Sequence, residues 1–155
     1  MSLSAVRRAA NVLNLSTPFG LLVARLGGAE VTVDDEGVFW AEGYRLPFPV
    51  AGAFTVGNVV ITGSRLDQLS PEVCAHEVRH TWQWMLCGTL FLPLYTVAMA
   101  WSWALTGDRA ACNLFERAAG LDSGGYHPYP VRRPLLRALA RVRRAVRVRP
   151  RRVAG

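Results

Sequence analysis

The chain has 155 residues, enough for one domain with a hydrophobic core, and 51% of them are hydrophobic while 19% are charged. This balance excludes a disordered chain. The formal net charge is +7, and all positive side chains are arginines because the sequence has no lysine. Ten arginines and no acidic residue lie between Arg132 and Arg152, so the basicity is mainly a property of the C-terminal tail.

Two short helices are expected at the N-terminus. Residues 3–14 carry apolar side chains at helical spacing, which predicts an amphipathic helix, and a second apolar segment from Phe19 to Leu26 ends at two glycines. Pro18 prevents a simple continuation of the first helix into the second. Polar residues and this proline also interrupt the apolar stretch before it takes the form of a signal peptide, so we expect no cleaved leader.

The pattern then changes to that of a small antiparallel sheet. The segment EVTVDDEGVFWAEG, residues 30–43, alternates apolar and polar residues on both sides of an Asp-Glu-Gly turn, which predicts a β-hairpin. The prolines that follow cannot donate to a sheet. Residues 55–63 predict one further strand. The expected fold class is α+β, with a hairpin plus one strand packed on helices.

A helix with clear start and stop signals follows the sheet. Ser70 is a good N-cap, Pro71 suits the first turn, and the acid Glu72 favours the positive end of the helix dipole. Gly88 predicts the end, so the helix should span residues 71–87. It carries the segment CAHEVRHTWQW, in which two histidines lie four residues apart.

The histidine pair indicates a metal site. Positions i and i+4 lie on one helix face, so His76 and His80 can bind one ion through their imidazole nitrogens. Glu77 follows the first histidine and can reach a water on that ion, which is the HExxH arrangement of two zinc ligands and a general base. Zinc lowers the pKa of such a water to about 7, and Glu77 would take its proton. The alternative is a histidine pair that holds no metal.

An uncharged apolar segment follows this helix. No aspartate, glutamate, lysine or arginine occurs between Arg79 and Asp108, and about 20 apolar residues are enough to cross a bilayer. A full span over residues 85–106 would place its two ends on opposite sides of the membrane, roughly 30 Å apart. Because that separation would keep a later ligand away from the histidines, we favour a core helix or a helix that lies in the membrane interface.

A tetrahedral zinc site needs a third protein ligand and one open position. The downstream candidates are Asp108, Glu116, Asp122 and His127. Glu116 fits best, because it lies in an apolar segment, expected as a helix over residues 109–119 capped by Asp108, where an unpaired carboxylate would be costly to bury. A glutamate that faces water or pairs with a neighbouring arginine is the alternative. Asn113, one turn earlier, could orient a ligand or a substrate.

The C-terminal part of the chain predicts a basic amphipathic helix and tail. Pro134 begins a pattern in which leucines and valines keep helical spacing while arginines fill the other faces, so residues 132–155 are expected to follow a single domain, residues 1–131. No aromatic residue follows Tyr129 and no DNA-binding motif accompanies the charge, which argues against nucleic acid as a partner. The pattern favours an anionic membrane surface, and a solvated basic extension is the alternative.

Residues 55–126 resemble a known group of proteins. HEVRHTWQW, followed by an aromatic and proline-containing apolar segment and then by NLFERAAG, is similar to small bacterial HExxH proteins on the gluzincin side of the zincin metallopeptidases. The resemblance implies a zincin-like helical core in which a HExxH helix and a following helix hold zinc. It implies that His76, His80 and Glu116 are the metal ligands. The general base would be Glu77.

The sequence also departs from that group. In gluzincins an acidic residue one turn after the ligand glutamate often holds a histidine by its second nitrogen, and here that position is Gly120. The support must then come from Asp122 or a backbone carbonyl. Tyr126 and His127 are candidates, by position only, for stabilising a transition state, and a structural role is their alternative. Arg79 projects off the ligand face and is expected at the surface or in an ion pair.

The cysteines bear on the cellular compartment. Cys74, Cys87 and Cys112 have no paired spacing, and an odd number suits a reducing environment, so we expect small buried thiols in a cytoplasmic protein. An accessory sulfur ligand from Cys74 or Cys112 is the alternative. Peripheral attachment to the inner face of the membrane, through the apolar segment and the arginine-rich tail, is left open.

Two functions agree with these features. The first is a zinc-dependent hydrolase, most simply a metallopeptidase that acts on a peptide or protein, in which Zn²⁺ is held by His76, His80 and Glu116. Glu77 activates the metal-bound water in this hypothesis. The second is a non-catalytic, membrane-associated binding or scaffold protein that keeps a zincin-like fold. The apolar segment, the arginine tail and the missing acid at position 120 favour the second function.

Overall fold

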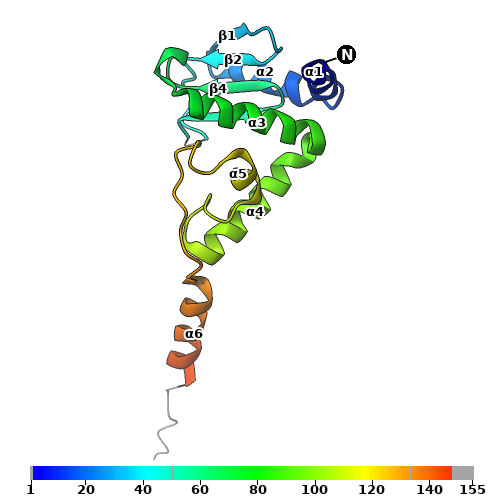
Figure 1. Ribbon diagram of the computed structural model, residues 1–155. Helices are drawn as coiled ribbons and strands as arrows, with labels where there is room; N and C mark the ends of the chain where they lie inside the picture. Colours follow the sequence, from blue (N-terminus) through cyan, green and yellow to red (C-terminus); the bar gives the residue numbers. More distant parts are fainter. Residues whose placement is uncertain (1, 50, 133, 148–155) are drawn as a thin grey trace, which may run out of the picture.

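The protein is an α+β structure in which a small sheet and two helices lie on one side of a long central helix and the other helices lie on the opposite side (Figure 1). This structure, a computed structural model, describes residues 2–49, 51–132 and 134–147. The helices are α1 (Leu3–Leu13), α2 (Ser16–Leu26), α3 (Pro71–Cys87), α4 (Phe91–Thr106), α5 (Leu114–Ala119) and α6 (Pro134–Arg147), with short 3-10 turns at η1 (Leu66–Gln68) and η2 (Gly88–Leu90). The strands are β1 (Glu30–Val33), β2 (Phe39–Glu42), β3 (Ala53–Val56) and β4 (Val59–Thr62).

The sheet has the strand order β1-β2-β4-β3 and is mixed. β1 and β2 form the expected antiparallel hairpin, and β3 pairs antiparallel with β4, but β2 and β4 run parallel. The prediction of an antiparallel sheet made of a hairpin plus one strand was therefore wrong in its strand count and in its pairing. Strand β3 lies at the edge of the sheet. The chain then turns back, so that β4 lies between β3 and β2 and runs in the same direction as β2.

The single strand expected over residues 55–63 is a second hairpin. Its turn is formed by Gly57 and Asn58, and Gly57 has a φ of +62°, a conformation that glycine adopts without strain. The turn also lies against the start of α2, where a Cβ at Gly57 would come within 2.4 Å of the backbone of Ser16 and Thr17. A Gly-Asn pair between apolar residues is itself a hairpin signal.

The expected helices are present, with differences at their starts. The predicted bounds of α3 are confirmed: the Ser70 side chain caps its first turn, and Gly88 ends it with a φ of +56°. α2 begins at Ser16 rather than Phe19, with Pro18 in the first turn, where the missing N–H is not needed. α6 begins at proline as expected.

The helix expected over residues 109–119 is shorter than predicted. α5 begins after Asn113, whose side-chain oxygen accepts the N–H two residues later at 3.0 Å. The carboxylate of Asp108 caps a separate turn instead, by accepting the N–H groups of residues 110–111. Two capping residues in succession explain the difference, because the second of them starts the regular helix. Glu116 is therefore in the first turn of α5 and not in mid-helix.

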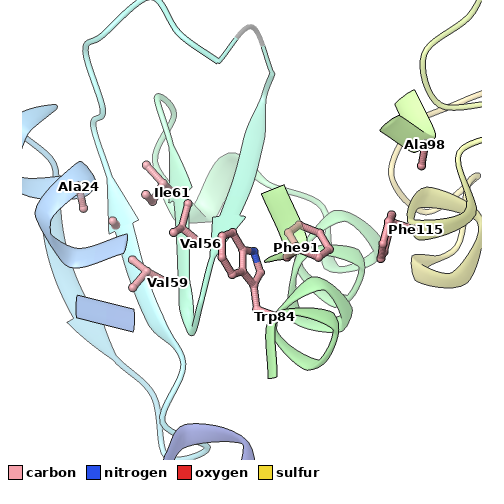
Figure 2. Packing of buried hydrophobic residues seen from close by; sticks show 9 residues of the cluster. Ala24, Val56, Val59, Ile61, Trp84, Phe91, Ala98 and Phe115 are labelled. Carbon is pink, nitrogen blue, oxygen red and sulfur yellow. The ribbon is translucent and has the colours of Figure 1, made fainter. Parts of the chain in front are cut away.

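Aromatic side chains join the sheet to α3, α4 and α5 (Figure 2). Trp84 of α3 is 1% exposed and lies against the sheet, where its indole N–H donates to the carbonyl oxygen of Thr55 at 2.9 Å. Phe91 of α4 lies between Trp84 and Phe115 of α5, with ring centroids 4.8 Å and 5.0 Å away. Burying a side chain such as Phe91 contributes roughly 1.5–3 kcal/mol, so these contacts hold α5 close to α3.

The chain turns back after α4, so that α5 contacts both α3 and α4. Gly107 ends α4 with a φ of +82°. The hydroxyl oxygen of Ser102 in α4 then accepts the N–H of Cys112 at 2.8 Å, which ties the returning segment to the helix that it has just left. This return is the geometry expected of a core or interfacial helix over residues 85–106.

Candidate metal centre

Helix α3 buries three polar side chains on the side that faces α5 and the sheet. His76 and His80 lie one above the other because four residues make about one turn, and Glu77 is displaced by about 100° around the helix. The exposed fractions of His76, Glu77 and His80 are 1%, 6% and 6%. Buried polar groups need partners, and here the partners come from α5 and the residue after it, from Gln83 of α3 itself, and from β3.

Glu116 of α5 completes a group of three ligand atoms. His76 Nε2 lies 3.0 Å from His80 Nε2 and 3.0 Å from Glu116 Oε2, and His80 Nε2 lies 3.8 Å from the same oxygen. Two ligands about 2.0–2.1 Å from a tetrahedral zinc are roughly 3.3 Å apart, and the three separations bracket that value. Within the described part of the chain, these residues form the one group of histidine, cysteine and acidic side chains that could hold a metal ion. Imidazoles also suit copper, iron and nickel, so the geometry does not select the metal.

The second nitrogen of each imidazole is held by an acceptor. His76 Nδ1 donates to the carbonyl oxygen of Gly120 at 2.9 Å, and His80 Nδ1 donates to Gln83 Oε1 at 2.8 Å. The amide nitrogen of Gln83 donates in turn to the carbonyl oxygen of Phe115 at 2.9 Å. Because Nδ1 faces an acceptor in both rings, the neutral form of each imidazole carries its proton there and leaves the Nε2 lone pair free for an ion, while a protonated ring can also donate from Nε2 to Glu116.

The end of α5 supplies the support that an acidic residue was expected to give. Of the two alternatives, Asp122 and a backbone carbonyl, the carbonyl of Gly120 contacts His76, and Asp122 is exposed. Arg79 is exposed as expected, but its partners are not acids: its guanidinium donates to the carbonyl oxygen of Ala119 at 2.6 Å and to Ser123 Oγ at 3.2 Å. Arg79 thus holds the C-terminal end of α5 against α3.

The loop after α5 covers His76. A Cβ at Gly124 would lie 2.6 Å from the Cε1 atom of that imidazole, so only glycine fits there. The ring centroid of Tyr126 is 6.0 Å from the centroid of His76. Burial and the nearby carboxylates of the site raise the pKa of Tyr126. Of the two loop candidates, Tyr126 therefore lies beside the cluster, while His127 is exposed.

The carboxylate of Glu116 has further partners besides the imidazoles. Its Oε1 accepts the hydroxyl of Tyr95 from the inner side of α4. Burial by itself would raise the pKa of Glu116, but the hydrogen bond from His76 and the nearby imidazole of His80 outweigh burial and lower the pKa to about 2. An ionised carboxylate next to two imidazole nitrogens is the state that binds a cation.

Glu77 lies beside the three ligands and has a different environment. Its Oε2 accepts the hydroxyl of Thr55, in strand β3, at 2.7 Å. Burial raises the pKa of Glu77, and the charge on His80 and the hydrogen bond from Thr55 offset that effect only in part. A carboxyl group with a raised pKa is suited to exchange protons near neutral pH.

Several site residues were missed in the sequence. Gln83 could have been found, because it lies three residues after His80 and therefore on the same helix face. Tyr95 lies in the apolar segment and Thr55 in a strand, where no local pattern marks a functional residue. The remaining ligand candidates lie outside the group of three ligands: Asp108, Asp122, His127, Cys74 and Cys112.

Comparison of the chain with protein-family models, with curated proteins and with solved structures gave no match. The resemblance of residues 55–126 to gluzincins therefore stays a prediction.

Proposed function

We propose that the protein is a hydrolase that depends on a divalent metal, most simply a zinc metallopeptidase with a gluzincin-like site. The observation that carries the proposal is that ligand atoms of His76, His80 and Glu116 all lie within 4.8 Å of one another, next to the buried carboxyl of Glu77. A cation bound between the two imidazoles would pair with the buried, ionised carboxylate of Glu116. Zinc bound there would act as a Lewis acid and lower the pKa of a water to about 7.

Glu77 is the residue best placed to move protons. Thr55 fixes one oxygen of its carboxyl group at 2.7 Å, which sets the orientation of the group beside the histidines. In the hydrolysis of a peptide bond, Glu77 takes a proton from the attacking water and passes it to the leaving amine. The raised pKa of Glu77 suits both steps, because it makes the carboxylate a stronger base toward the water than an ordinary glutamate, and the carboxyl group can then release the proton to the amine.

Tyr126 is the candidate for stabilising the oxygen that becomes negatively charged during the reaction. Its ring lies beside His76, and burial raises its pKa, so the phenol stays protonated and can donate a hydrogen bond. Gln83 and the carbonyl of Gly120 act one step further out, by holding the two imidazoles in the orientation that directs Nε2 to the metal.

Metal content tests the proposed centre. Purified protein should contain about one zinc per chain, and His80→Ala should contain little, because two ligands hold the ion far less well than three. His127→Ala is a matched control, since it removes an exposed histidine outside the group. Equal metal content in the wild type and in His80→Ala would remove the proposal.

Cleavage of a broad peptide library tests the reaction. Activity should be sensitive to a chelator, and Glu77→Gln should lower it on the order of 10²–10⁴-fold while zinc content stays unchanged. A variant that loses both zinc and activity would show that Glu77 supports the site and does not perform the chemistry. Full activity in Glu77→Gln would exclude Glu77 as the general base.

The burial of the ligands favours a second candidate, a non-catalytic membrane-associated scaffold that keeps a zincin-like fold. His76 and Glu116 are only 1% and 2% exposed, as in a metal site that stabilises a fold. In that case Glu77→Gln would behave like the wild type in the cell and would still bind zinc. Chelator-sensitive cleavage that disappears in this variant would count against the scaffold.

A further inference from the structure

Helix α4 exposes a large apolar surface. Its inner side, with Phe91, Ala98 and Ser102, is buried against the body of the protein. Most of its remaining circumference carries apolar side chains that are 46–68% exposed: Leu92, Leu94, Val97, Trp101 and Trp103. The helical stretch from Pro71 to Thr106 is long and apolar enough to cross a membrane, yet only 17% of its most apolar window is buried.

This surface has no charged residue to keep it in water. No aspartate, glutamate, lysine or arginine occurs between Arg79 and Asp108, so every exposed position of α4 is apolar or uncharged. Contiguous apolar surface of this kind marks a site of contact with another protein or with a membrane. Trp101 and Trp103 are of the residue type that is enriched where a membrane meets water.

Helix α6 brings positive charge next to this surface. It contacts α4, and the N–H of Arg132, just before it, donates to the carbonyl oxygen of Leu105 at 2.8 Å. Leu139 and Val142 of α6 are 59% and 61% exposed, so these two apolar side chains are not covered by the described part of the chain. The exposed arginines of this helix are Arg137, Arg141, Arg143 and Arg144. Figure 1 shows α6 extending away from the body, beyond the end of α4.

We propose that α4 and α6 form a docking surface for an anionic lipid bilayer, on which both helices lie in the interface. Charge complementarity selects the lipid: a surface with tryptophans, exposed leucines and valines, and a row of arginines without acidic residues matches anionic headgroups above acyl chains. A second copy of the chain fits less well, because a symmetric contact over α6 would bring like charges together. The proposal does not depend on metal binding or on catalysis.

The position of α5 determines whether α4 can cross a membrane or must lie in its interface. The segment after α4 returns, so that Glu116 comes within 3.0 Å of His76. A span over α4 would separate α3 and α5 by the thickness of the bilayer, roughly 30 Å. Helix α4 therefore exposes its apolar outer side, while its inner side packs against the rest of the protein.

Vesicle co-sedimentation of the full chain tests the docking surface. The protein should bind vesicles of phosphatidylcholine mixed with phosphatidylglycerol, bind phosphatidylcholine alone weakly, and lose affinity as salt is added. Arg141→Gln combined with Arg144→Gln should weaken binding to the anionic vesicles on the order of 25-fold, since each arginine near such a surface contributes roughly fivefold. Val97→Ser combined with Trp101→Ser should weaken binding to both kinds of vesicle.

Variants of α2 are the matched controls. Phe19→Ser and Arg25→Gln change an exposed apolar and an exposed basic residue outside α4 and α6, and they should bind as the wild type does. Circular dichroism and zinc content of each variant separate lost docking from lost folding and from a lost metal centre.

Equal binding to neutral and anionic vesicles, or unchanged binding in both double variants, would overturn the proposal. So would stable oligomers without vesicle binding, or membrane association that resists both salt and carbonate.

Discussion

Helices α3 and α4 are separated only by the short turn η2, yet they place polar and apolar side chains in opposite ways. α3 buries His76, Glu77 and His80, whereas α4 leaves Trp101 and Trp103 in solvent. Soluble proteins ordinarily do the reverse with such residues. The buried polar side chains of α3 have partners within the described part of the chain, whereas the outer side of α4 has no covering there. In the two proposals, a cation would bind between the partners of α3, and a lipid surface would cover α4.

One residue connects the two helices. Tyr95 extends from the inner side of α4, and its hydroxyl donates to the carboxylate of Glu116, next to the histidines of α3. A helix with its side chains is about 10–12 Å across. A protein docked through the outer side of α4 would therefore hold the candidate metal centre at about that distance from the lipid surface.

The largest loss of zinc affinity is expected when Glu116, the candidate ligand from α5, is removed. Glu116→Ala should lower zinc affinity by more than roughly 100-fold, because it removes a direct ligand. Losing a residue that only hydrogen-bonds to a ligand costs roughly 100-fold at most. Competition with a chromogenic chelator measures this loss. Asp122→Ala is the control, since that carboxylate is exposed. Zinc affinity that is equal in the two variants would mean that the histidines bind metal without Glu116.

Removing Gln83, which holds a ligand but is not one, should give a smaller loss of zinc affinity. Gln83→Ala frees the Nδ1 atom of His80 and should lower zinc affinity about 10–100-fold, because the imidazole loses its fixed orientation. Gln83→Glu keeps an acceptor at that position and should restore most of the affinity. The same chelator competition measures both variants. If Gln83→Ala binds zinc as tightly as the wild type, packing alone orients the ring.

Local signals explain how much of α3 could be predicted. Ser70, Pro71 and Gly88 fix its ends through local interactions within one turn, so the local sequence is enough to predict where the helix begins and ends. The prediction that Glu116 has polar partners also followed from chemistry, because an acid in an apolar segment needs a partner. The structure places that carboxylate beside both histidines.

The rest depended on contacts between distant parts of the chain. The parallel pairing of β2 with β4 requires β3 to occupy the sheet edge, and no short pattern encodes that choice. Tyr95 belongs to an apolar segment whose sequence does not indicate which side will be buried. The start of α5 was misjudged because Asp108 and Asn113 are both good caps, and tertiary packing decides between them.

The pH dependence of stability should distinguish the metal-free and metal-bound forms. Burial lowers the pKa of His80, but the nearby carboxylates of Glu116 and Glu77 outweigh burial, so the pKa lies above its ordinary value of 6.5. A histidine with a raised pKa in the folded state stabilises the protein fully below 6.5, and this contribution is lost as the pH rises through the folded-state pKa. The metal-free protein should therefore become less stable over that range, by at most about 1.4 kcal/mol per pH unit for one proton.

Zinc should reverse this trend, because it binds the imidazoles only when they are neutral and its affinity rises with pH. Thermal unfolding in EDTA and in excess zinc, over the same series of buffers, measures both slopes. His80→Gln removes the titrating group and should flatten the slope in EDTA. Parallel curves with and without zinc would mean that the ion does not bind at this histidine.

The smallest effect is expected on the outer side of α4 when no lipid is present. Val97→Ser and Trp101→Ser should each change the free energy of unfolding by no more than about 0.5 kcal/mol, because both side chains are mostly exposed. Phe91→Ala, on the buried side of the same helix, should cost about 3–5 kcal/mol. Urea denaturation of lipid-free protein measures all three. A loss of several kcal/mol in the serine variants would mean that α4 packs against protein on both sides, and the contrast with α3 would then disappear.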